Sequence, residues 1–438
     1  MGEQNLASAV TDSINTQPMS PAQMGAVLVC VFLVALNGFD VLAIAFSAPG
    51  IASEWQLSEG ALGWLVTMDL FGMAIGSIFL GNLADRFGRR PVMLTSVLIM
   101  SLGMAAAALA TNVQLLSGFR ILTGIGIGAV LASANALVAE LANNRHRNSL
   151  VILMAGGSSL GAAIGGLIAT QLLEKYGWRS VFYLGATGTT IAIPLILLFL
   201  PESISFLATQ RPPGALAKIN EILRRFKKAP LPVLPPLQED AKAIGFNKLL
   251  GPKYFKATLL LSLAYVAHIS TYYFMLKWVP KLVTDMGFSE SLGGRVLVWL
   301  NLGGLAGFLV LALAMQVLDA RRLAITAVFS AAVVVGLYGQ ISTDLTMLTL
   351  ASICAGFFSN AAAGAMFPLM ANYFSAEVRA SGSGVVLGVG RVGAIAGPLL
   401  AGYLLQAQYP LSQVTFIIAL GSAMAGLAIF LLDSSPRR

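Results

Sequence analysis

Twelve long apolar runs follow one another along this chain, and each is long enough to cross a membrane. A helix rises about 1.5 Å per residue, so about 20 apolar residues span the hydrocarbon core of a bilayer. Backbone polar groups must be bonded within the element there, which leaves helices as the structure for such runs. The expected spans are 24–48, 60–82, 91–111, 114–138, 149–172, 179–200, 254–278, 293–315, 322–341, 346–371, 379–405 and 412–433. The sequence therefore predicts an all-α membrane protein with twelve transmembrane helices.

The composition supports membrane lipid as the surrounding medium. Of the 438 residues, 57% are hydrophobic and 11% charged, against about 25% charged in ordinary soluble domains. The formal net charge is +8, but the basic residues lie in the loops between apolar runs, so they do not indicate a nucleic-acid surface. Cys30 and Cys354 fall inside apolar runs, and there are only two histidines. Neither a disulfide framework nor a metal site is expected.

The distribution of charge predicts the orientation. An even number of spans places both termini on one side, and most of the 27 Lys and Arg residues lie in the tails and in the connections on that same side. Positive loops stay in the cytoplasm, so both termini are expected to be cytoplasmic in a bacterial inner membrane. The N-terminal tail, residues 1–23, begins without Lys or Arg and does not resemble a cleaved signal peptide.

A long, basic connection at 201–253 divides the spans into a bundle at 24–200 and a bundle at 254–433, followed by a tail at 434–438. Within this connection, Leu216–Phe226 has helical periodicity and a basic face, which is typical of an anchor along the anionic inner surface. The two bundles also resemble each other, because the Gly-Ala-Ala-Ile-Gly of span 5 recurs as Gly-Ala-Ile-Ala-Gly in span 11. Two six-helix pseudo-repeats with a site between them are the architecture that alternating access needs.

Asp40 is the most informative polar residue, because it lies deep in the first span. A carboxylate there costs about 3 kcal/mol or more and by default marks a functional site. By helix rise, Asp40 and Asp69 lie about 13 Å below the outer surface and Arg120 about 9 Å below it. If Asp40 faces Arg120, protonating the acid would release the arginine, which predicts proton coupling; a purely structural ion pair is the alternative. Asp69 suits a proton site or a structural polar contact equally well.

Several polar residues are candidates for binding a substrate. Arg391 is expected near the midplane of span 11, where a guanidinium can bind a carboxylate through two hydrogen bonds or form a salt bridge between the halves. Span 7 places Tyr265, His268 and Tyr272 on one face, where they could surround an aromatic ring, although a lone histidine more often serves packing. Lys277, at the predicted outer end of span 7, is expected to reach the interface. Further candidates are the amides Asn37, Asn301 and Asn360.

The stretch Gly81–Pro91, with sequence GNLADRFGRRP, resembles the loop motif of the major facilitator superfamily. Supporting similarities are Arg120–Gly126, Gly177–Arg179 and Pro201–Ser203, which extend the resemblance over nearly the whole chain. The resemblance implies a monomeric transporter, not an enzyme, that works by alternating access. The motif implies gating roles for Asp85, Arg86, Arg89 and Arg90, and Asp319 belongs to a degraded copy of it after span 8. Glu140 at the end of span 4, and Glu377 and Arg379 at the start of span 11, are expected at the cytoplasmic face, a position that suits gating there.

Within that superfamily the sequence is most similar to the aromatic acid:proton symporters. Their first span carries an Asp-Gly-x-Asp motif, which corresponds to Asn37–Asp40 here with the first acid replaced. The resemblance implies import of a small aromatic carboxylate with a proton, driven by the proton gradient without a cofactor, for aromatic compound catabolism. Two alternatives stay open: proton-driven efflux of amphipathic compounds, and a sensor that binds an aromatic compound without moving it.

Overall fold

The computed structural model describes residues 16–234, 249, 251–341, 344–375 and 378–432. Every regular element in these ranges is an α-helix. In the first half they are α2 Pro21–Trp55, α3 Glu59–Leu65, α4 Met68–Phe87, α5 Arg89–Ala108, α6 Val113–Leu141, α7 Arg147–Tyr176, α8 Arg179–Phe199, α9 Ile204–Gln210 and α10 Ala215–Arg225. In the second half they are α11 Phe255–Asp285, α12 Glu290–Ala314, α13 Ala320–Tyr338, α14 Leu345–Tyr373, α15 Arg379–Gln406 and α16 Leu411–Phe430.

Twelve stretches in the described ranges are long and apolar enough to span a membrane, which confirms the predicted fold class. The second span differs from the prediction, because it is not one helix but two, α3 and α4. At the break, the Thr67 amide bonds the Trp64 carbonyl at 3.1 Å instead of the Gly63 carbonyl that a continuous helix would use, and the Gly63 carbonyl accepts the Thr67 hydroxyl at 3.3 Å. A hydroxyl can replace helical hydrogen bonding in this way inside a membrane.

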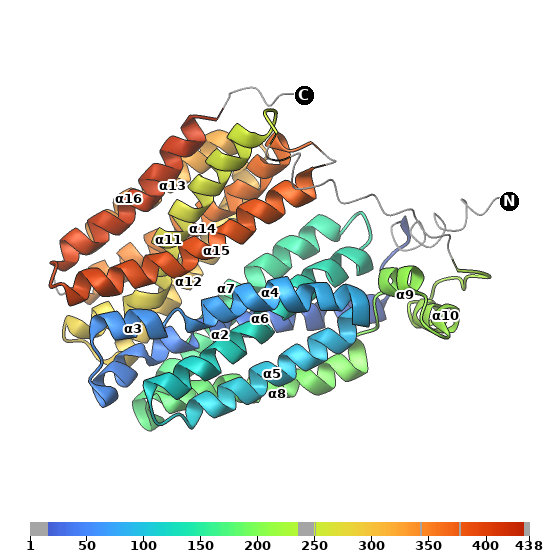
Figure 1. Cartoon of the computed structure of the whole chain (residues 1–438), viewed down its shortest axis with the longest axis horizontal. Helices are drawn as coiled ribbons and strands as arrows, with labels where there is room; N and C mark the ends of the chain where they lie inside the picture. The colour runs from blue at the N-terminus through green and yellow to red at the C-terminus, as the bar shows by residue number, and fades with distance from the viewer. Residues whose placement is uncertain (1–15, 235–248, 250, 342–343, 376–377, 433–438) are drawn as a thin grey trace.

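The spans form two bundles, α2–α8 and α11–α16, which lie side by side in Figure 1. The short helices α9 and α10 lie at one end of the first bundle, the end at which α2 begins and α8 finishes. We call this the terminus end and the other the opposite end. The predicted helix in the central connection is present as α10, and its Ile219, Ile222 and Leu223 are buried in the same apolar cluster as residues of the first bundle.

The repeated glycine motifs have the same packing role in each bundle. A methyl group added to Gly161 on α7 would come within 2.0 Å of the Ala35 carbonyl oxygen on α2, and one added to Gly393 on α15 would come within 2.2 Å of the Val266 oxygen on α11. Glycine therefore lets the fifth helix of each bundle approach the backbone of the first. This shared contact explains the similarity between the halves.

The packing predicts opposite effects for two glycine substitutions on α15. Gly393→Ala should destabilise the protein by about 1–3 kcal/mol, because the backbone of α11 must move. Gly388→Ala should be neutral or stabilising by up to about 1 kcal/mol, because no atom of the described residues lies within 4 Å of the added methyl and alanine favours the helix. Thermal unfolding of the purified variants in detergent measures both. Equal melting temperatures would contradict this packing.

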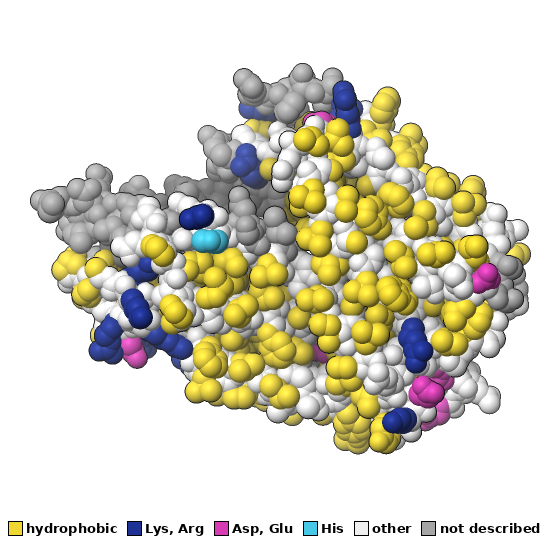
Figure 2. Space-filling view, turned by 180° about the vertical axis from the view of Figure 1, so that it is seen from behind, with side chains coloured by type: hydrophobic (Ala, Val, Ile, Leu, Met, Phe, Trp, Pro, Cys, Tyr) yellow, Lys and Arg dark blue, Asp and Glu magenta, His cyan; other side chains and the backbone are white. Residues whose placement is uncertain are grey.

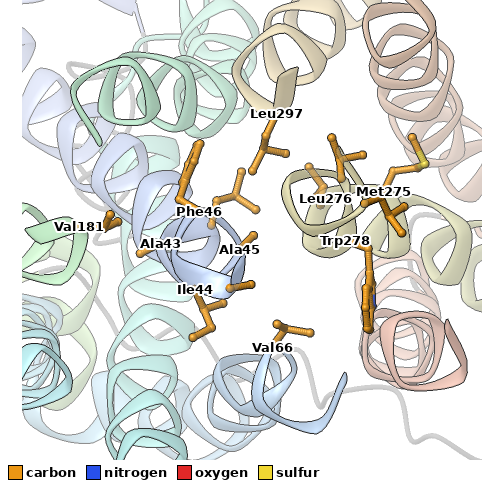
Figure 3. Close-up of a cluster of buried hydrophobic side chains, with 14 of the residues drawn as sticks. Ala43, Ile44, Ala45, Phe46, Val66, Val181, Met275, Leu276, Trp278 and Leu297 are labelled. Carbon is orange, nitrogen blue, oxygen red and sulfur yellow. The ribbon is translucent and has the colours of Figure 1, made fainter. Parts of the chain in front are cut away.

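The buried apolar cores show where the bundles touch. At the opposite end one core is shared by α2, α8, α11 and α12, with Phe46, Trp278 and Leu297 among its members (Figure 3). Towards the terminus end the cores are separate: one belongs mainly to the first bundle and a second to the α11–α16 bundle. The bundles are therefore joined at the opposite end and apart at the terminus end, as the ribbons in Figure 1 also show.

The surface agrees with a membrane location. Figure 2 shows a face on which hydrophobic side chains cover most of the middle, while Lys, Arg, Asp and Glu gather mainly toward the two ends. Many large apolar side chains of the protein are exposed, among them Phe79, Leu102 and Leu313. A water-facing surface rarely carries so large a continuous apolar area, so this one fits contact with lipid.

Candidate functional site

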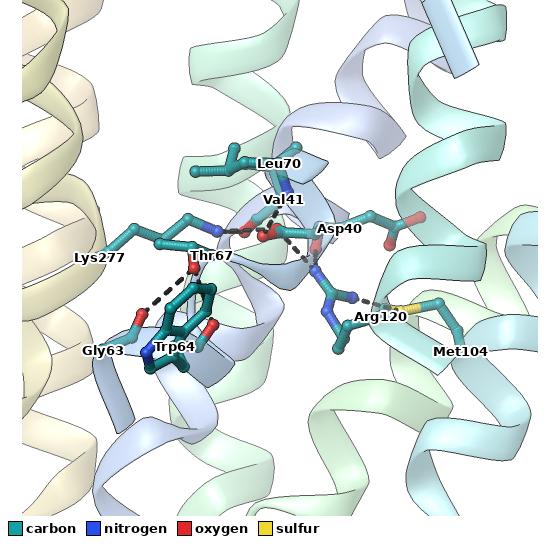
Figure 4. A network of polar contacts seen from close by, with 10 residues as sticks. Asp40, Val41, Gly63, Trp64, Thr67, Leu70, Met104, Arg120 and Lys277 are labelled. Atoms are coloured by element: carbon teal, nitrogen blue, oxygen red, sulfur yellow. Dashed lines mark hydrogen bonds and ion pairs between the residues drawn. The ribbon is translucent and has the colours of Figure 1, made fainter. Parts of the chain in front are cut away.

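A buried ion cluster centres on Asp69, directly after the break between α3 and α4. Figure 4 labels its two basic partners, Arg120 and Lys277. Asp69 Oδ2 accepts hydrogen bonds from Arg120 Nη2 at 2.9 Å and from Lys277 Nζ at 2.7 Å. All three side chains are fully buried. Asp69 and Arg120 belong to the first bundle and Lys277 to the second, so this cluster crosses the boundary between the bundles.

The break between α3 and α4 explains the position of Asp69. Asp69 lies in the first turn of α4, and its Oδ1 accepts the Leu70 amide at 3.0 Å. The start of a helix carries unpaired amides and a partial positive charge, which stabilises a carboxylate there. A continuous helix from 60 to 82 would have no such end at this depth.

Arg120 approaches Asp40, but not in the predicted way. Its Nη2 donates to the backbone carbonyl of Asp40 at 2.8 Å, its Nη1 contacts the Met104 sulfur at 3.2 Å, and its guanidinium lies 5.8 Å from the Phe182 ring centroid. The expected ion pair between Arg120 and the Asp40 carboxylate is replaced by the pair with Asp69. Arg120 reaches both acids because α2 and α4 each pack against α6.

The Asp40 carboxylate is the least satisfied group in this region. Asp40 is completely buried, and neither carboxylate oxygen has a hydrogen-bond partner among the described residues. It points to α8, where a methyl group at Gly185 would lie 2.7 Å from Oδ1. One turn away, Asn37 is also buried, and neither atom of its amide group has a hydrogen-bond partner in the described part of the chain. Burying an unpaired polar group is costly, so an unpartnered carboxylate at this depth marks a functional site.

The expectation that Lys277 reaches the membrane interface was wrong. Lys277 is buried, and its Nζ donates to the Val41 carbonyl at 2.6 Å as well as to Asp69. The predicted seventh span stopped at 278, whereas α11 continues through Pro280 to Asp285. Lys277 thus lies about two helical turns inside the helix, too deep for its ammonium to reach water easily.

A row of tyrosines on α11 leads from this cluster toward the terminus end. Tyr265 packs against Gly390 of α15, where an added methyl would meet its ring at 2.3 Å. Tyr272 and Tyr273 form an edge-to-face pair with ring centroids 5.8 Å apart. Tyr273 was not among the predicted binding residues; it lies one helical turn before Lys277, so it is on the cluster side of α11.

Arg391 lies beside these tyrosines. Its charge acts electrostatically on the phenols of Tyr265 and Tyr273, and Asp69 acts on Tyr273 as well. Arg391 is partly buried, and within the described ranges its guanidinium makes no hydrogen bond or ion pair. The alternative of a salt bridge between the halves is therefore not formed in this conformation. The cation is available to an anion that enters between the bundles.

The other predicted binding residues are mostly used within the second bundle. Asn360 Nδ2 donates to the Tyr272 hydroxyl at 2.9 Å, which holds that ring in place. Asn301 donates to Leu297 of its own helix at 2.8 Å. His268 is fully buried, and its ring nitrogens bond the Ser422 hydroxyl at 2.9 Å and the Ser359 carbonyl at 3.0 Å. We therefore correct the predicted contact of His268 with substrate: the imidazole links three helices of the bundle.

The charges with a predicted gating role near α4 and α5 stay within the first bundle. Arg89 forms an ion pair with Glu140, whose other oxygen accepts the Ser203 hydroxyl at 2.6 Å. Glu202 accepts the backbone amides that begin α5, at Arg89 (2.8 Å) and Arg90 (3.2 Å). Gly88, at φ +101°, makes the turn that allows this approach.

The remaining charges with a predicted gating role also make no link between the bundles in the part of the chain that the structure describes. Asp85 and Arg86 are exposed. Asp319 caps α13 through the amides of Arg321 and Arg322, and Arg379 donates to the Phe374 carbonyl at 3.4 Å. Glu377 lies outside the described residues. The described members of this set therefore do not latch the terminus end, in agreement with its separate cores.

Contacts across the bundles gather instead at the opposite end. Lys281 on α11 pairs with Glu59 at the start of α3 at 3.0 Å, and Trp64 Nε1 donates to the Tyr403 hydroxyl of α15 at 2.8 Å. Gly63 and Gly402 bring α3 and α15 close together. These contacts and the Asp69–Lys277 pair close the opposite end over the tyrosines and Arg391.

Comparison with known proteins agrees with this architecture. The sequence matches the family description "Major Facilitator Superfamily" over residues 28–338 and 279–438. The chain belongs to this superfamily. Two solved structures share its fold: a xylose transporter XylE from E. coli in a partially occluded inward-open conformation (TM-score 0.72, 17% identity, 96% of this chain and 100% of that one) and a D-xylose-proton symporter (TM-score 0.69, 17% identity, 94% and 98%).

The predicted resemblance to aromatic acid permeases is also confirmed. The chain is 33% identical to the 4-hydroxybenzoate transporter PcaK of Acinetobacter baylyi over 95% of its length and 92% of that protein's. It is 31% identical to a gallate transporter of Pseudomonas putida (96% and 94%) and to the 3-(3-hydroxy-phenyl)propionate transporter of Escherichia coli (97% and 98%). This superfamily member is a multi-pass membrane transporter and not an enzyme.

Proposed function

We propose that this transporter imports a small aromatic carboxylate together with a proton, across a bacterial inner membrane and with the terminus end in the cytoplasm. The observation that carries the proposal is a pair of groups without protein partners among the described residues: the buried Asp40 carboxylate in the first bundle and the Arg391 guanidinium in the second. One suits a proton and the other a carboxylate. The proton gradient is the driving force, and no cofactor takes part.

The chemistry of the second bundle favours an aromatic anion. Arg391 would bind the carboxylate, and the rings of Tyr265 and Tyr273, on which the Arg391 charge acts, would pack against the aromatic ring. Tyr272, held by Asn360, would define the far wall of the site. The similar transporters named above are described as carrying 4-hydroxybenzoate, gallate and 3-(3-hydroxy-phenyl)propionate, which all combine an aromatic ring with a carboxylate.

The cycle follows from alternating access by a monomer in the lipid bilayer. With the opposite end open to the outside, Asp40 takes up a proton and Arg391 takes the anion. The bundles then rock to the conformation described here, in which the opposite end is closed and the terminus end is open. Loss of the anion and the proton to the cytoplasm completes import. An anion moving with one proton transfers no net charge, so the inside-negative membrane potential does not oppose its uptake.

The test is counterflow in proteoliposomes that contain only the purified protein. Labelled benzoate, 4-hydroxybenzoate, gallate and 3-(3-hydroxyphenyl)propionate are offered to vesicles preloaded with the unlabelled compound, with D-xylose as a control solute. The proposal predicts exchange of at least one aromatic acid and none of xylose, and net uptake that requires an inward proton gradient. Net movement of these acids outward under an inward proton gradient would favour efflux by antiport, and binding without exchange would favour a sensor.

A further inference from the structure

Lys277 is the only member of the buried ion cluster that belongs to the second bundle, among the residues described. It is held by Asp69 of α4 and by the Val41 carbonyl of α2, at 2.7 and 2.6 Å. When the opposite end opens, α11 must move away from α2 and α4, so these two contacts must break. A buried ammonium that loses its carboxylate partner is strongly destabilised, which makes this pair a latch.

The charges around the latch can be counted. Arg120 on α6 donates to the backbone carbonyl of Asp40 and to the carboxylate of Asp69 on α4. The same carboxylate accepts a hydrogen bond from Lys277 on α11. The other neighbours of Asp40, Met104 on α5 and Gly185 on α8, carry no charge. With Asp40 ionised, two acids balance two bases. With Asp40 protonated, one positive charge is in excess in a buried site.

We propose that Lys277 senses the proton on Asp40 and is the residue through which that proton opens the opposite end. This inference rests on the proposed function and extends it. When Asp40 is protonated, Asp69 is the one remaining anion for two cations. Arg120 is fixed within the first bundle, whereas Lys277 is carried by the bundle that can move. Lys277 is therefore the cation that leaves, and the opposite end opens.

The same count explains why the anion must accompany the proton. An anion bound at Arg391 lies near Tyr273, on which the charges of both Arg391 and Asp69 act. The negative charge of the bound anion offsets the added proton, so the total charge between the bundles equals that of the empty protein with Asp40 ionised. Closure of the opposite end over a buried latch is then favoured again. The empty carrier and the fully loaded carrier can therefore close the opposite end, whereas a carrier that holds only the proton stays open to the outside until the anion binds.

The test follows the opening of the opposite end without requiring transport. Spin-labelled cysteines replace the exposed Ser53, near the end of α2, and Ala407, just after α15, in a background without Cys30 and Cys354. Distances between the labels are measured over pH in lipid nanodiscs by pulsed electron paramagnetic resonance. In the otherwise native protein, acidification should shift the distances to longer values, and adding 4-hydroxybenzoate at acid pH should reverse the shift.

The variants separate this latch from a merely structural ion pair. Lys277→Met should abolish the response to pH, whereas Lys277→Arg should retain it. Asp40→Asn should stay open at every pH when no anion is present. Lys281→Met is the matched control, because Lys281 lies one turn further along α11 and also pairs across the bundles, with Glu59, but has no contact with Asp69. This variant should retain the shift of the distances with pH, although it removes one of the contacts that close the opposite end.

Each outcome decides the inference. Distances that do not respond to pH in the native protein, or that respond equally in Lys277→Met and Lys281→Met, would overturn it. The inference can also be judged apart from the substrate. If no aromatic acid is exchanged in proteoliposomes but acid opens the native protein and not Lys277→Met, the proposed substrate is wrong and the proton latch stands.

Discussion

Replacing Asp40 by Asn should abolish accumulation of the substrate while leaving its exchange intact. Asn is nearly the same size as Asp but cannot take up or release a proton. One pH unit corresponds to about 1.36 kcal/mol, so with one proton per anion the native protein should concentrate the anion about tenfold per pH unit. Asp40→Asn should reach a ratio of about one. Counterflow needs no net proton movement, so its rate should stay within about twofold of the native value.

Glu54→Gln is the matched control for this experiment. Glu54 lies near the end of the same helix, but it is exposed and pairs with Arg179 at 2.8 Å. Exposed ion pairs contribute little, so accumulation by this variant should equal that of the native protein. If Asp40→Asn still accumulated the acid under an inward proton gradient, Asp40 would not be the proton carrier. Asp69 would then become the acid to test.

Replacing Arg391 by Ala should weaken binding of the aromatic acid about 10- to 150-fold, as measured by the concentration dependence of counterflow. Hydrogen bonds to a charged group contribute about 1.5–3 kcal/mol, and each 1.4 kcal/mol is about tenfold in affinity. The affinity of Arg391→Lys should lie between those of the native protein and Arg391→Ala, because an ammonium keeps the charge but lacks the planar guanidinium that binds a carboxylate through two hydrogen bonds. Proton coupling should persist at saturating substrate.

Arg295→Ala provides the comparison, because Arg295 is an exposed arginine on α12. The affinity of the Arg295→Ala variant for the aromatic acid should match that of the native protein. Unchanged affinity in Arg391→Ala would show that the carboxylate binds elsewhere, and undiminished transport of uncharged amphipathic compounds by the same variant would support the efflux alternative. Comparing the affinities of the Arg391→Ala and Arg295→Ala variants thus distinguishes a specific anion site from a general effect of positive charge.

Much of the fold could be predicted because length and apolarity determine membrane helices almost alone. All twelve spans were predicted, and the resemblance of Gly81–Pro91 to the superfamily motif was confirmed by the comparisons. The break at Val66–Thr67 could not be predicted, since these residues fit a continuous apolar run. A single threonine hydroxyl that bonds a backbone carbonyl does not change the hydropathy pattern of the run.

The partners within the site were harder to predict than their depth. Helix rise placed Asp40, Asp69 and Arg120 at a similar level, and the structure brings Arg120 to both acids. Helix rise could not decide which carboxylate the Arg120 guanidinium binds, because that depends on the rotation of α4 about its axis. Lys277 was misplaced because Pro280 and Lys281 look like a helix end, although α11 continues past them. Tyr273 was missed because its neighbour Tyr272 fitted the face chosen from Tyr265.

The most direct measurement of the central claim records proton movement during transport. Proteoliposomes in a lightly buffered medium receive 4-hydroxybenzoate, and external pH is followed with and without a protonophore, with protein-free vesicles to correct for diffusion of the neutral acid. Proton-coupled import predicts that the medium becomes alkaline as the anion enters, in the native protein but not in Asp40→Asn. Uptake of the anion without alkalinisation, or acidification as it moves, would contradict the account.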